Sequence, residues 1–144
     1  MSRRNFILNP PYREILSSDS TKSFQNELFG NRNIISELIQ NNKNERHVWV
    51  YENNNEIEAC IIFDDQDVSF HVEFLLSNRL IKSQSSGSKL IMLLEDIGKE
   101  LGYAKIELWA LEQKIPYYKK HDYIDTKKNS SGRFGSMNYM YKDL

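Results

Sequence analysis

The sequence of 144 residues is long enough to bury a hydrophobic core, and we expect a single domain over residues 1–144. Hydrophobic residues make up 40% of the chain and charged residues 27%, a balance that excludes an intrinsically disordered protein. A formal net charge of -1 gives no general attraction to nucleic acid or to an anionic membrane, so we expect neither as a partner.

The single cysteine, Cys60, lies in an apolar run, where a buried hydrophobic side chain is the main interpretation and a nucleophile the alternative. No apolar stretch approaches the roughly 20 residues that span a bilayer. The start of the chain, Met1 to Arg4, is not followed by a signal-type apolar segment. We therefore expect a cytoplasmic location.

The first 46 residues give weak structural signals. Phe6 to Leu8 is a short apolar run followed by two prolines, which predicts a first strand. Apolar residues between 12 and 40 fall at helical spacings, interrupted at Gly30, and predict two modest helices. The polar residues 41–44 are expected to form a loop.

The middle of the chain is typical of strands. His47 to Tyr51 and Ile57 to Phe63 flank an asparagine-rich turn and predict a hairpin. Val68 to Leu76 predicts a third strand, whose strict alternation would place His71, Glu73 and Leu75 on one face.

The second half alternates helices and strands. Apolar residues from Gly87 to Leu101 keep the spacing of an amphipathic helix, with Gly102 as its C-cap. Three further elements follow: a strand at Lys105 to Leu111, a short helix at Ile115 to His121, and a last strand at Met137 to Tyr141. This order predicts an α/β or mixed α+β protein.

The loop from Lys82 to Gly87 is the first candidate site. A strand that leads through small residues into a helix can hold phosphate on backbone N–H groups and the positive helix end. Lys82 adds charge, the serines can donate hydrogen bonds, and Gly87 allows close approach. The alternative is a polar loop in which Ser86 caps the helix.

Two further groups contain residues that could act in catalysis. Tyr117, Tyr118 and Tyr123 lie at the ends of a short basic helix, where aromatic side chains more often form core or groove lining. Glu73 lies among apolar residues, so its carboxylate must be paired or functional, because burying it alone is costly. His71 alone is more often structural.

In this order, the three groups resemble the GCN5-related N-acetyltransferase (GNAT) superfamily over residues 71–123. The matching features are a strand, a pyrophosphate loop, a helix, a strand and a Tyr-Tyr-x-Lys helix end. Within it, His71 to Asn78 resembles the His-Ile-Glu-Asp-Ile-Ala-Val-Asn strand of eukaryotic-type glucosamine-6-phosphate N-acetyltransferases. The resemblance implies an acyl-CoA N-acyltransferase fold with a central, mostly antiparallel mixed sheet flanked by helices.

The resemblance also implies acetyl-CoA as co-substrate, no metal, a small-molecule amine acceptor such as glucosamine 6-phosphate, and a homodimer. Glu73 is the candidate base and Tyr118 the candidate acid for the departing thiolate, since phenol and thiol pKa values are close. Lys105, Trp109 and Glu73 are the expected acceptor-binding residues. The expected cofactor-binding residues are Leu75, Leu76, Ser77, Lys82, Ser83, Gln84, Ser85, Ser86, Gly87, Ser88 and Lys114.

Several positions depart from the superfamily pattern. Ser85 replaces the first loop glycine, which is tolerable if its φ is negative, and Asp122 replaces a glycine in the last motif. Phe74 and Trp109 replace carboxylates, and Lys114 replaces an asparagine that often contacts the cofactor. Two alternatives stay open: acetylation of another small amine or a peptide amine, and an acyl-CoA-binding module without activity.

Overall fold

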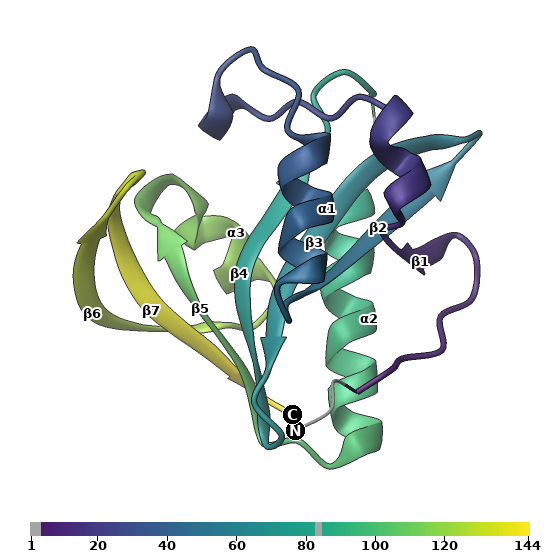
Figure 1. Cartoon of the computed structure of the whole chain (residues 1–144). Coiled ribbons are helices and arrows are strands. Elements are labelled where there is room, and N and C mark those ends of the chain that lie inside the picture. Colours follow the sequence, from purple (N-terminus) through teal and green to yellow (C-terminus); the bar gives the residue numbers. More distant parts are fainter. Residues whose placement is uncertain (1–3, 83–84) are drawn as a thin grey trace.

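The protein is described by a computed structural model that covers residues 4–82 and 85–144. Within these residues a single sheet runs in the order β1-β2-β3-β4-β5-β7-β6 (Figure 1). Only β4 and β5 are parallel, and the other neighbours are antiparallel. The strands are β1 Tyr12–Glu14, β2 His47–Asn53, β3 Glu56–Asp65, β4 Ser69–Ser77, β5 Lys105–Leu111, β6 Ile124–Gly132 and β7 Gly135–Asp143.

Helices cover both faces of the sheet. α1 (Ile35–Lys43) lies on one face and α2 (Ser86–Leu101) on the other, while α3 (Ile115–Lys120) follows β5 (Figure 1). Three short 3₁₀ turns complete the described chain: η1 Ser17–Thr21, η2 Glu27–Phe29 and η3 Glu112–Lys114. The mixed, mostly antiparallel sheet flanked by helices confirms the expected fold class.

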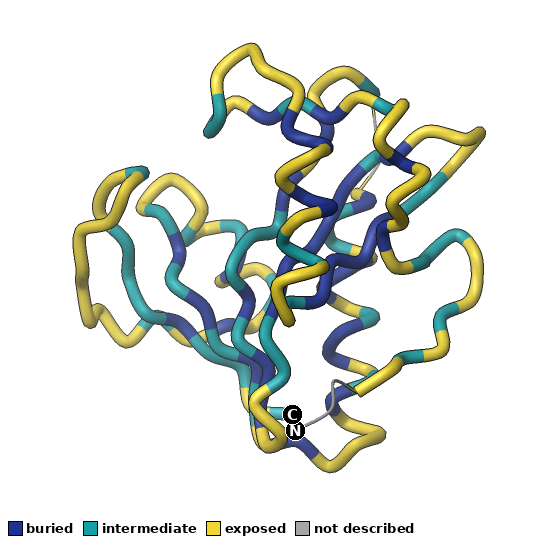
Figure 2. Tube along the Cα trace, in the orientation of Figure 1, coloured by how far each residue is buried: buried dark blue, intermediate teal, exposed yellow. Residues whose placement is uncertain are grey.

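The central strands are buried on both sides, as the long apolar runs of β2 and β3 require (Figure 2). In β3, Ile61 joins the core beneath α2 and Ile62 the core beneath α1. Leu90 and Leu94 of α2 are fully buried, and each such side chain stabilises the fold by about 1.5–3 kcal/mol. Among the described residues no helix is long and apolar enough to cross a membrane.

A β-bulge interrupts β4 at Glu73. Phe63 of β3 pairs with Val72, but its neighbour Ile62 pairs with Phe74, so Glu73 is an extra residue in β4. The bulge reverses the alternation of side chains beyond it, and Leu75 packs with the α2 core together with Val72. The prediction that Leu75 shares a face with His71 and Glu73 was therefore wrong, because strict alternation assumed an uninterrupted ladder.

β4 and β5 separate after the bulge. They are paired only along 69–72 and 105–108, and beyond Val72 and Leu108 no backbone pairing joins them. The two strands diverge in the upper half of Figure 1, with α3 and the β6–β7 hairpin beside the opening. The carboxyl-terminal halves of β4 and β5 therefore form the two walls of a cleft.

Among the remaining predictions of secondary structure, some are wrong and others are confirmed. Phe6 to Leu8 is not a strand, because Phe6 instead packs its ring on Trp49 and Phe63. The two helices expected between residues 12 and 40 are wrong: the α-helix there begins only at Ile35, after two 3₁₀ turns, and it continues through Lys43. The hairpin is confirmed, and so is α2 with Gly102 at its C-cap. β6 was not predicted.

Candidate functional site

The amino-terminal end of α2 faces β4 across the first part of the site. Ser85 is the N-cap of α2 and has a φ of 64°, in the left-handed region. The condition for tolerating serine here, a negative φ, is therefore not met: Ser85 keeps the left-handed turn that glycine usually provides, at an energetic cost. Helix geometry leaves the amides of Ser86, Gly87 and Ser88 without an intrahelical acceptor, and they can bind an anion.

A cavity of about 350 Å³ lies in front of these amides. It collects most of the residues expected from the sequence to bind a cofactor, whereas Lys82 is exposed and not part of its lining. Ser83 and Gln84 lie outside the described residues. The cavity is lined by Asn26, Glu27, Leu28, Leu75, Leu76, Ser77, Ser85, Ser86, Gly87, Ser88, Lys114, Tyr117 and Tyr118.

Gly87 keeps this cavity open. A Cβ atom at Gly87 would lie 3.8 Å from the Leu75 side chain and 3.9 Å from Ser77 Oγ, at ordinary contact distance. A methyl group therefore fits there, but a longer side chain must extend into the cavity. This cradle of amides, small residues and Lys114 suits a pyrophosphate.

Two serine hydroxyls of the cradle are occupied within the protein. Ser86 is buried and its Oγ donates to Glu58 Oε1 at 2.5 Å. Ser88 Oγ lies 2.7 Å from Tyr117 Oη and 3.2 Å from His121 Nε2. The sequence led us to expect that the serine hydroxyls donate hydrogen bonds to a ligand. Because the hydroxyls of Ser86 and Ser88 already have partners within the protein, these residues can bind a ligand mainly through their backbone amides.

Residues of η2 form one wall of the cavity and were missed in the sequence. Asn26 is buried and donates from Nδ2 to the Ser77 carbonyl at 2.9 Å, which fixes η2 against the end of β4. Its Oδ1 accepts from the Leu28 amide at 3.0 Å. No local signal connects residues 26 and 77, because their contact forms only through the tertiary fold.

Tyr118 lies at the junction of the site. It is 8% exposed and belongs both to the lining of the first cavity and to that of a smaller one of about 70 Å³ between β4 and β5. Burial, together with neighbouring Tyr117, raises the pKa of Tyr118 above that of a free phenol, so its hydroxyl stays protonated. Among residues 4–82 and 85–144 this hydroxyl has no hydrogen-bond partner.

The chain leaves α3 through Asp122, whose φ of 68° confirms the left-handed conformation that the sequence suggested. This turn lets the Tyr123 amide donate to the Tyr118 carbonyl at 3.0 Å. Tyr118 is therefore held at the end of α3 with its ring toward the cleft.

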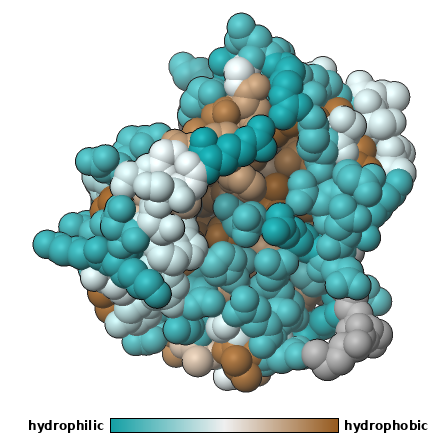
Figure 3. Space-filling model, turned by 60° about the vertical axis from the view of Figure 1, so that its left-hand side comes forward, coloured by the Kyte–Doolittle hydropathy of each residue, from teal (hydrophilic) through white to brown (hydrophobic). Residues whose placement is uncertain are grey.

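A second cavity of about 360 Å³, the β4–β5 chamber, opens on the other side of the cleft. It shares Glu73, Phe74 and Phe134 with the small cavity that Tyr118 lines, so the two cavities are adjacent. Figure 3 shows a hollow with an apolar floor and a hydrophilic rim on this side of the molecule. The chamber is lined by His71, Val72, Glu73, Phe74, Trp109, Arg133, Phe134 and Met137.

Glu73 and His71 are the ionisable pair of the chamber. His71 Nε2 lies 3.8 Å from Glu73 Oε2, and His71 Nδ1 lies 3.8 Å from Glu107 Oε1. Arg46 Nη2 lies 3.9 Å from Glu73 Oε1. Glu73 is thus a partly exposed carboxylate with cationic neighbours, positioned by the bulge toward the chamber.

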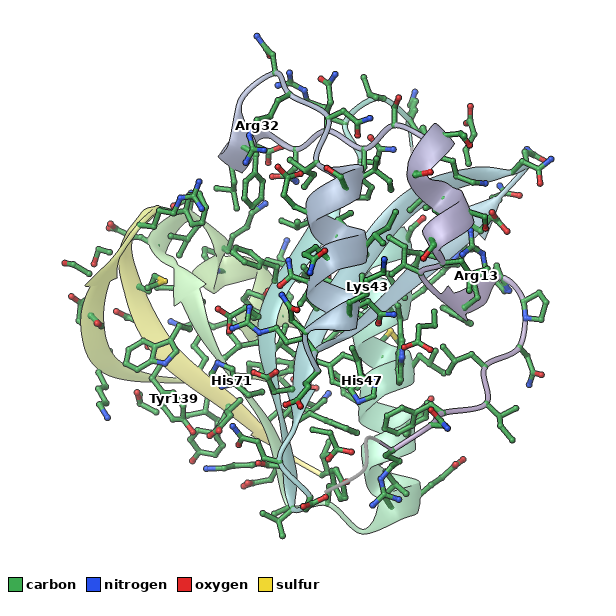
Figure 4. All side chains as sticks on the ribbon, in the orientation of Figure 1. Arg13, Arg32, Lys43, His47, His71 and Tyr139 are labelled. Atoms are coloured by element: carbon green, nitrogen blue, oxygen red, sulfur yellow. The ribbon has the colours of Figure 1, made fainter. Side chains whose placement is uncertain are left out.

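The charged groups beside His71 belong to β5, and Tyr139 of β7 binds both of them (Figure 4). Burial would raise the pKa of Glu107, but a hydrogen bond from Tyr139 and the charges of Lys105 and His71 lower it. Lys105 Nζ donates to Tyr139 Oη at 3.2 Å and lies 3.4 Å from Glu107 Oε2. Lys105 does not line the cavities described above, whereas Trp109 does.

No protein-family model matches the sequence, and no curated protein matches it. Solved structures do match. A GCN5-related N-acetyltransferase from Rhodopseudomonas palustris is 14% identical with a TM-score of 0.72, covering 98% of this chain and 99% of that chain. A GNAT-family acetyltransferase from Elizabethkingia anophelis, with acetyl-CoA bound, is 15% identical with a TM-score of 0.64, covering 92% and 97%.

An aminoglycoside 6′-N-acetyltransferase complexed with coenzyme A is 14% identical, with a TM-score of 0.62 and coverage of 76% of this chain and 79% of that chain. At these identities the likeness establishes the architecture of the chain. This chain has the fold of the GCN5-related N-acetyltransferases.

Proposed function

We propose that this protein is an acetyl-CoA-dependent N-acetyltransferase that acts on a small primary amine. One observation carries the proposal: where β4 and β5 separate, a small cavity lined by both Tyr118 and Glu73 lies between the α2 cradle and the chamber, sharing lining residues with each. A donor that enters from α2 and an acceptor that enters from the chamber meet beside Tyr118. Structures with the same fold that hold acetyl-CoA or coenzyme A support this assignment.

In this proposal the cradle binds the donor. The amides of Ser86, Gly87 and Ser88 and the positive end of the 16-residue helix α2 hold the pyrophosphate, with Lys114 as a nearby cation. The arm that carries the thioester lies along 75–77 of β4, where pairing with β5 has ended.

The chemistry requires three proton transfers. Acetyl-CoA supplies an acetyl group as a thioester. Glu73 accepts a proton from the acceptor ammonium, directly or through water, and the neutral amine forms a C–N bond to the acetyl carbon. A backbone N–H near Leu75 stabilises the negative charge on the acetyl oxygen. The C–S bond then breaks and Tyr118 donates its proton to the thiolate, while the new amide nitrogen loses its second proton, directly or through water, to the Tyr118 phenolate.

The acceptor is the finer part of the proposal. The resemblance of residues 71–78 favours glucosamine 6-phosphate, and a homodimer would accompany that assignment. The residue expected to hold the sugar phosphate, Lys105, is engaged by Tyr139 and Glu107 at the closed end of the sheet. Glucosamine 6-phosphate is therefore one member of the acceptor panel, beside monoamines, polyamines and peptide amines.

A thiol-coupled assay of CoA release with this amine panel tests the proposal. We expect amine-dependent release by the native protein and a loss of roughly 100-fold in kcat for Tyr118→Phe, because the variant cannot protonate the thiolate. Its dissociation constant for acetyl-CoA should change by less than about twofold, because the phenyl ring is retained. Acetyl-CoA binding without release for every amine would instead identify a binding module, and an unchanged kcat would remove Tyr118 from the acid role.

A further inference from the structure

The lining of the β4–β5 chamber is too apolar for a polyhydroxylated or polycationic acceptor. We infer that the acceptor is a primary amine carried on an aromatic body, with the ammonium at Glu73 and the body against Phe74, Phe134 and Trp109. This inference rests on the proposed function and specifies the substrate class of the same site.

Two phenylalanine rings, Phe74 and Phe134, line one wall of the chamber, and the ring of Phe29 packs against both of them. Phe29 of η2, Phe74 of β4 and Phe134 of the β6–β7 turn form a closed triangle, with centroids 5.3, 5.8 and 5.9 Å apart. Their interplanar angles of 62–78° are the edge-to-face geometry that aromatic rings prefer. Phe29 thus holds Phe74 and Phe134 in place, and these two rings offer the chamber a preformed surface onto which another aromatic ring can pack.

The side chains of β5 and β7 that line the chamber are also apolar. Trp109 of β5 and Met137 of β7 line the chamber, and the Trp109 ring is held edge-on by Tyr139 at 5.6 Å. A methionine sulfur and an indole face both make favourable contacts with an aromatic ligand. A ligand ring inside is therefore bounded on several sides by apolar surface.

Charge decides which end of the acceptor carries the amine. Glu73 is the one carboxylate among the described lining residues, and it lies at the side of the chamber that opens toward Tyr118. Arg133 lies at the other side, stacked 5.0 Å from the Phe134 ring. One ammonium is therefore attracted to Glu73, whereas a second cationic group deeper in the acceptor would meet Arg133.

The same lining argues against other amines. A sugar needs a hydrogen-bonding partner for each hydroxyl that loses water, and Val72, Phe74, Phe134 and Met137 offer none through their side chains. A polyamine or aminoglycoside needs several carboxylates, and the described lining has Glu73 alone. An aromatic ring, by contrast, gains free energy of binding from contact with each of these apolar side chains.

The test compares 2-phenylethylamine, glucosamine 6-phosphate and spermidine as acceptors in the CoA-release assay. We expect kcat/KM for 2-phenylethylamine to exceed that of both others by at least roughly tenfold. Phe134→Ser should raise the KM for 2-phenylethylamine roughly tenfold and leave the KM for acetyl-CoA unchanged. Ile124→Ser, an exposed apolar position on β6 outside the chamber lining, is the matched control and should change neither value.

Calorimetric titration of 2-phenylethylamine into the complex with CoA separates this inference from the proposed function. Binding that Phe134→Ser weakens, without CoA release for any amine, would support the acceptor class and contradict the acetyltransferase activity. Turnover that favours glucosamine 6-phosphate or spermidine would overturn the acceptor class and leave the activity intact. An unchanged KM and affinity in Phe134→Ser would also overturn it.

Discussion

Ser85 has a strained backbone and lies at the start of α2, in the proposed donor cradle. Its φ of 64° places an L-residue in the left-handed region, and no side-chain hydrogen bond caps α2 to compensate for the cost. The adjacent Ser86 is the opposite case, because its buried hydroxyl binds Glu58 at 2.5 Å and ties the start of α2 to β3. The two neighbouring serines should therefore respond to substitution with opposite signs.

We expect Ser85→Gly to raise the free energy of unfolding by roughly 0.5–1 kcal/mol, because glycine removes the left-handed penalty and only part of this gain is lost to chain entropy. The matched variant Ser86→Ala should lower it by roughly 1–2 kcal/mol, because a hydrogen bond to a carboxylate disappears. Urea unfolding followed by circular dichroism measures both. Destabilisation by Ser85→Gly would mean that the serine side chain has a role that the backbone angle does not reveal.

At the residue scale, sequence patterns could locate Gly87 and Tyr118, because each belongs to a short motif with a fixed local geometry. The sign of φ at Ser85 could not be predicted, since serine adopts either sign and the surrounding structure decides. The role of Asn26 in fixing η2 against β4 could not be predicted either, because its hydrogen bond to Ser77 joins residues far apart in the sequence. The aromatic triangle has the same origin, since Phe29, Phe74 and Phe134 meet only in the folded chain.

At the scale of elements, α2 is fastened to the carboxyl-terminal strands by a buried carboxylate. Glu95 of α2 is 5% exposed, accepts from Tyr123 Oη at 3.0 Å and pairs with Lys142 of β7 at 2.9 Å. Burial and the Glu95 carboxylate raise the pKa of Tyr123, so its hydroxyl remains a donor. Glu95 thereby connects α2, which begins at the proposed donor cradle, to the β6–β7 hairpin, which lines the β4–β5 chamber.

Lys142→Met should destabilise the protein by roughly 3 kcal/mol, because it leaves the Glu95 charge buried with a single neutral donor. The double variant Glu95→Met with Lys142→Met should recover part of that loss, since the buried charge is gone, although the buried Tyr123 hydroxyl loses its acceptor. Equilibrium unfolding in urea for the two single variants and the double variant gives the coupling energy. Additive losses would show that the pair does not act as a unit.

The elements that the sequence predicted well are those with strong periodicity. α2 has a buried stripe and a glycine C-cap, and β3 has an apolar run covered on both faces. β6 escaped prediction because its side chains are almost all polar and exposed, as is typical of a charged edge strand. The bulge at Glu73 also left no local signal, although it determines which side chains of β4 face the cleft.

At the scale of the whole molecule, the cleft exists because the parallel pair β4–β5 is joined for only part of its length. Each strand is held on its outer side, β4 by β3 and β5 by β7, so their ends can separate without loss of the core. The stretch of β4 that no longer pairs with β5 lines one cavity together with the start of α2. A ligand that fills this cavity should therefore stabilise the entire fold.

Acetyl-CoA at about 100 times its dissociation constant should add about 2.7 kcal/mol to the free energy of unfolding and raise the melting temperature by roughly 5–10 °C. Gly87→Asp should abolish this shift, because its side chain brings bulk and a negative charge toward the pyrophosphate. Gly87→Ala is the matched control and should keep most of the shift, since a Cβ there meets its neighbours at 3.8 Å or more. Scanning calorimetry with and without acetyl-CoA measures all three proteins, and a full shift in Gly87→Asp would place the donor elsewhere than on α2.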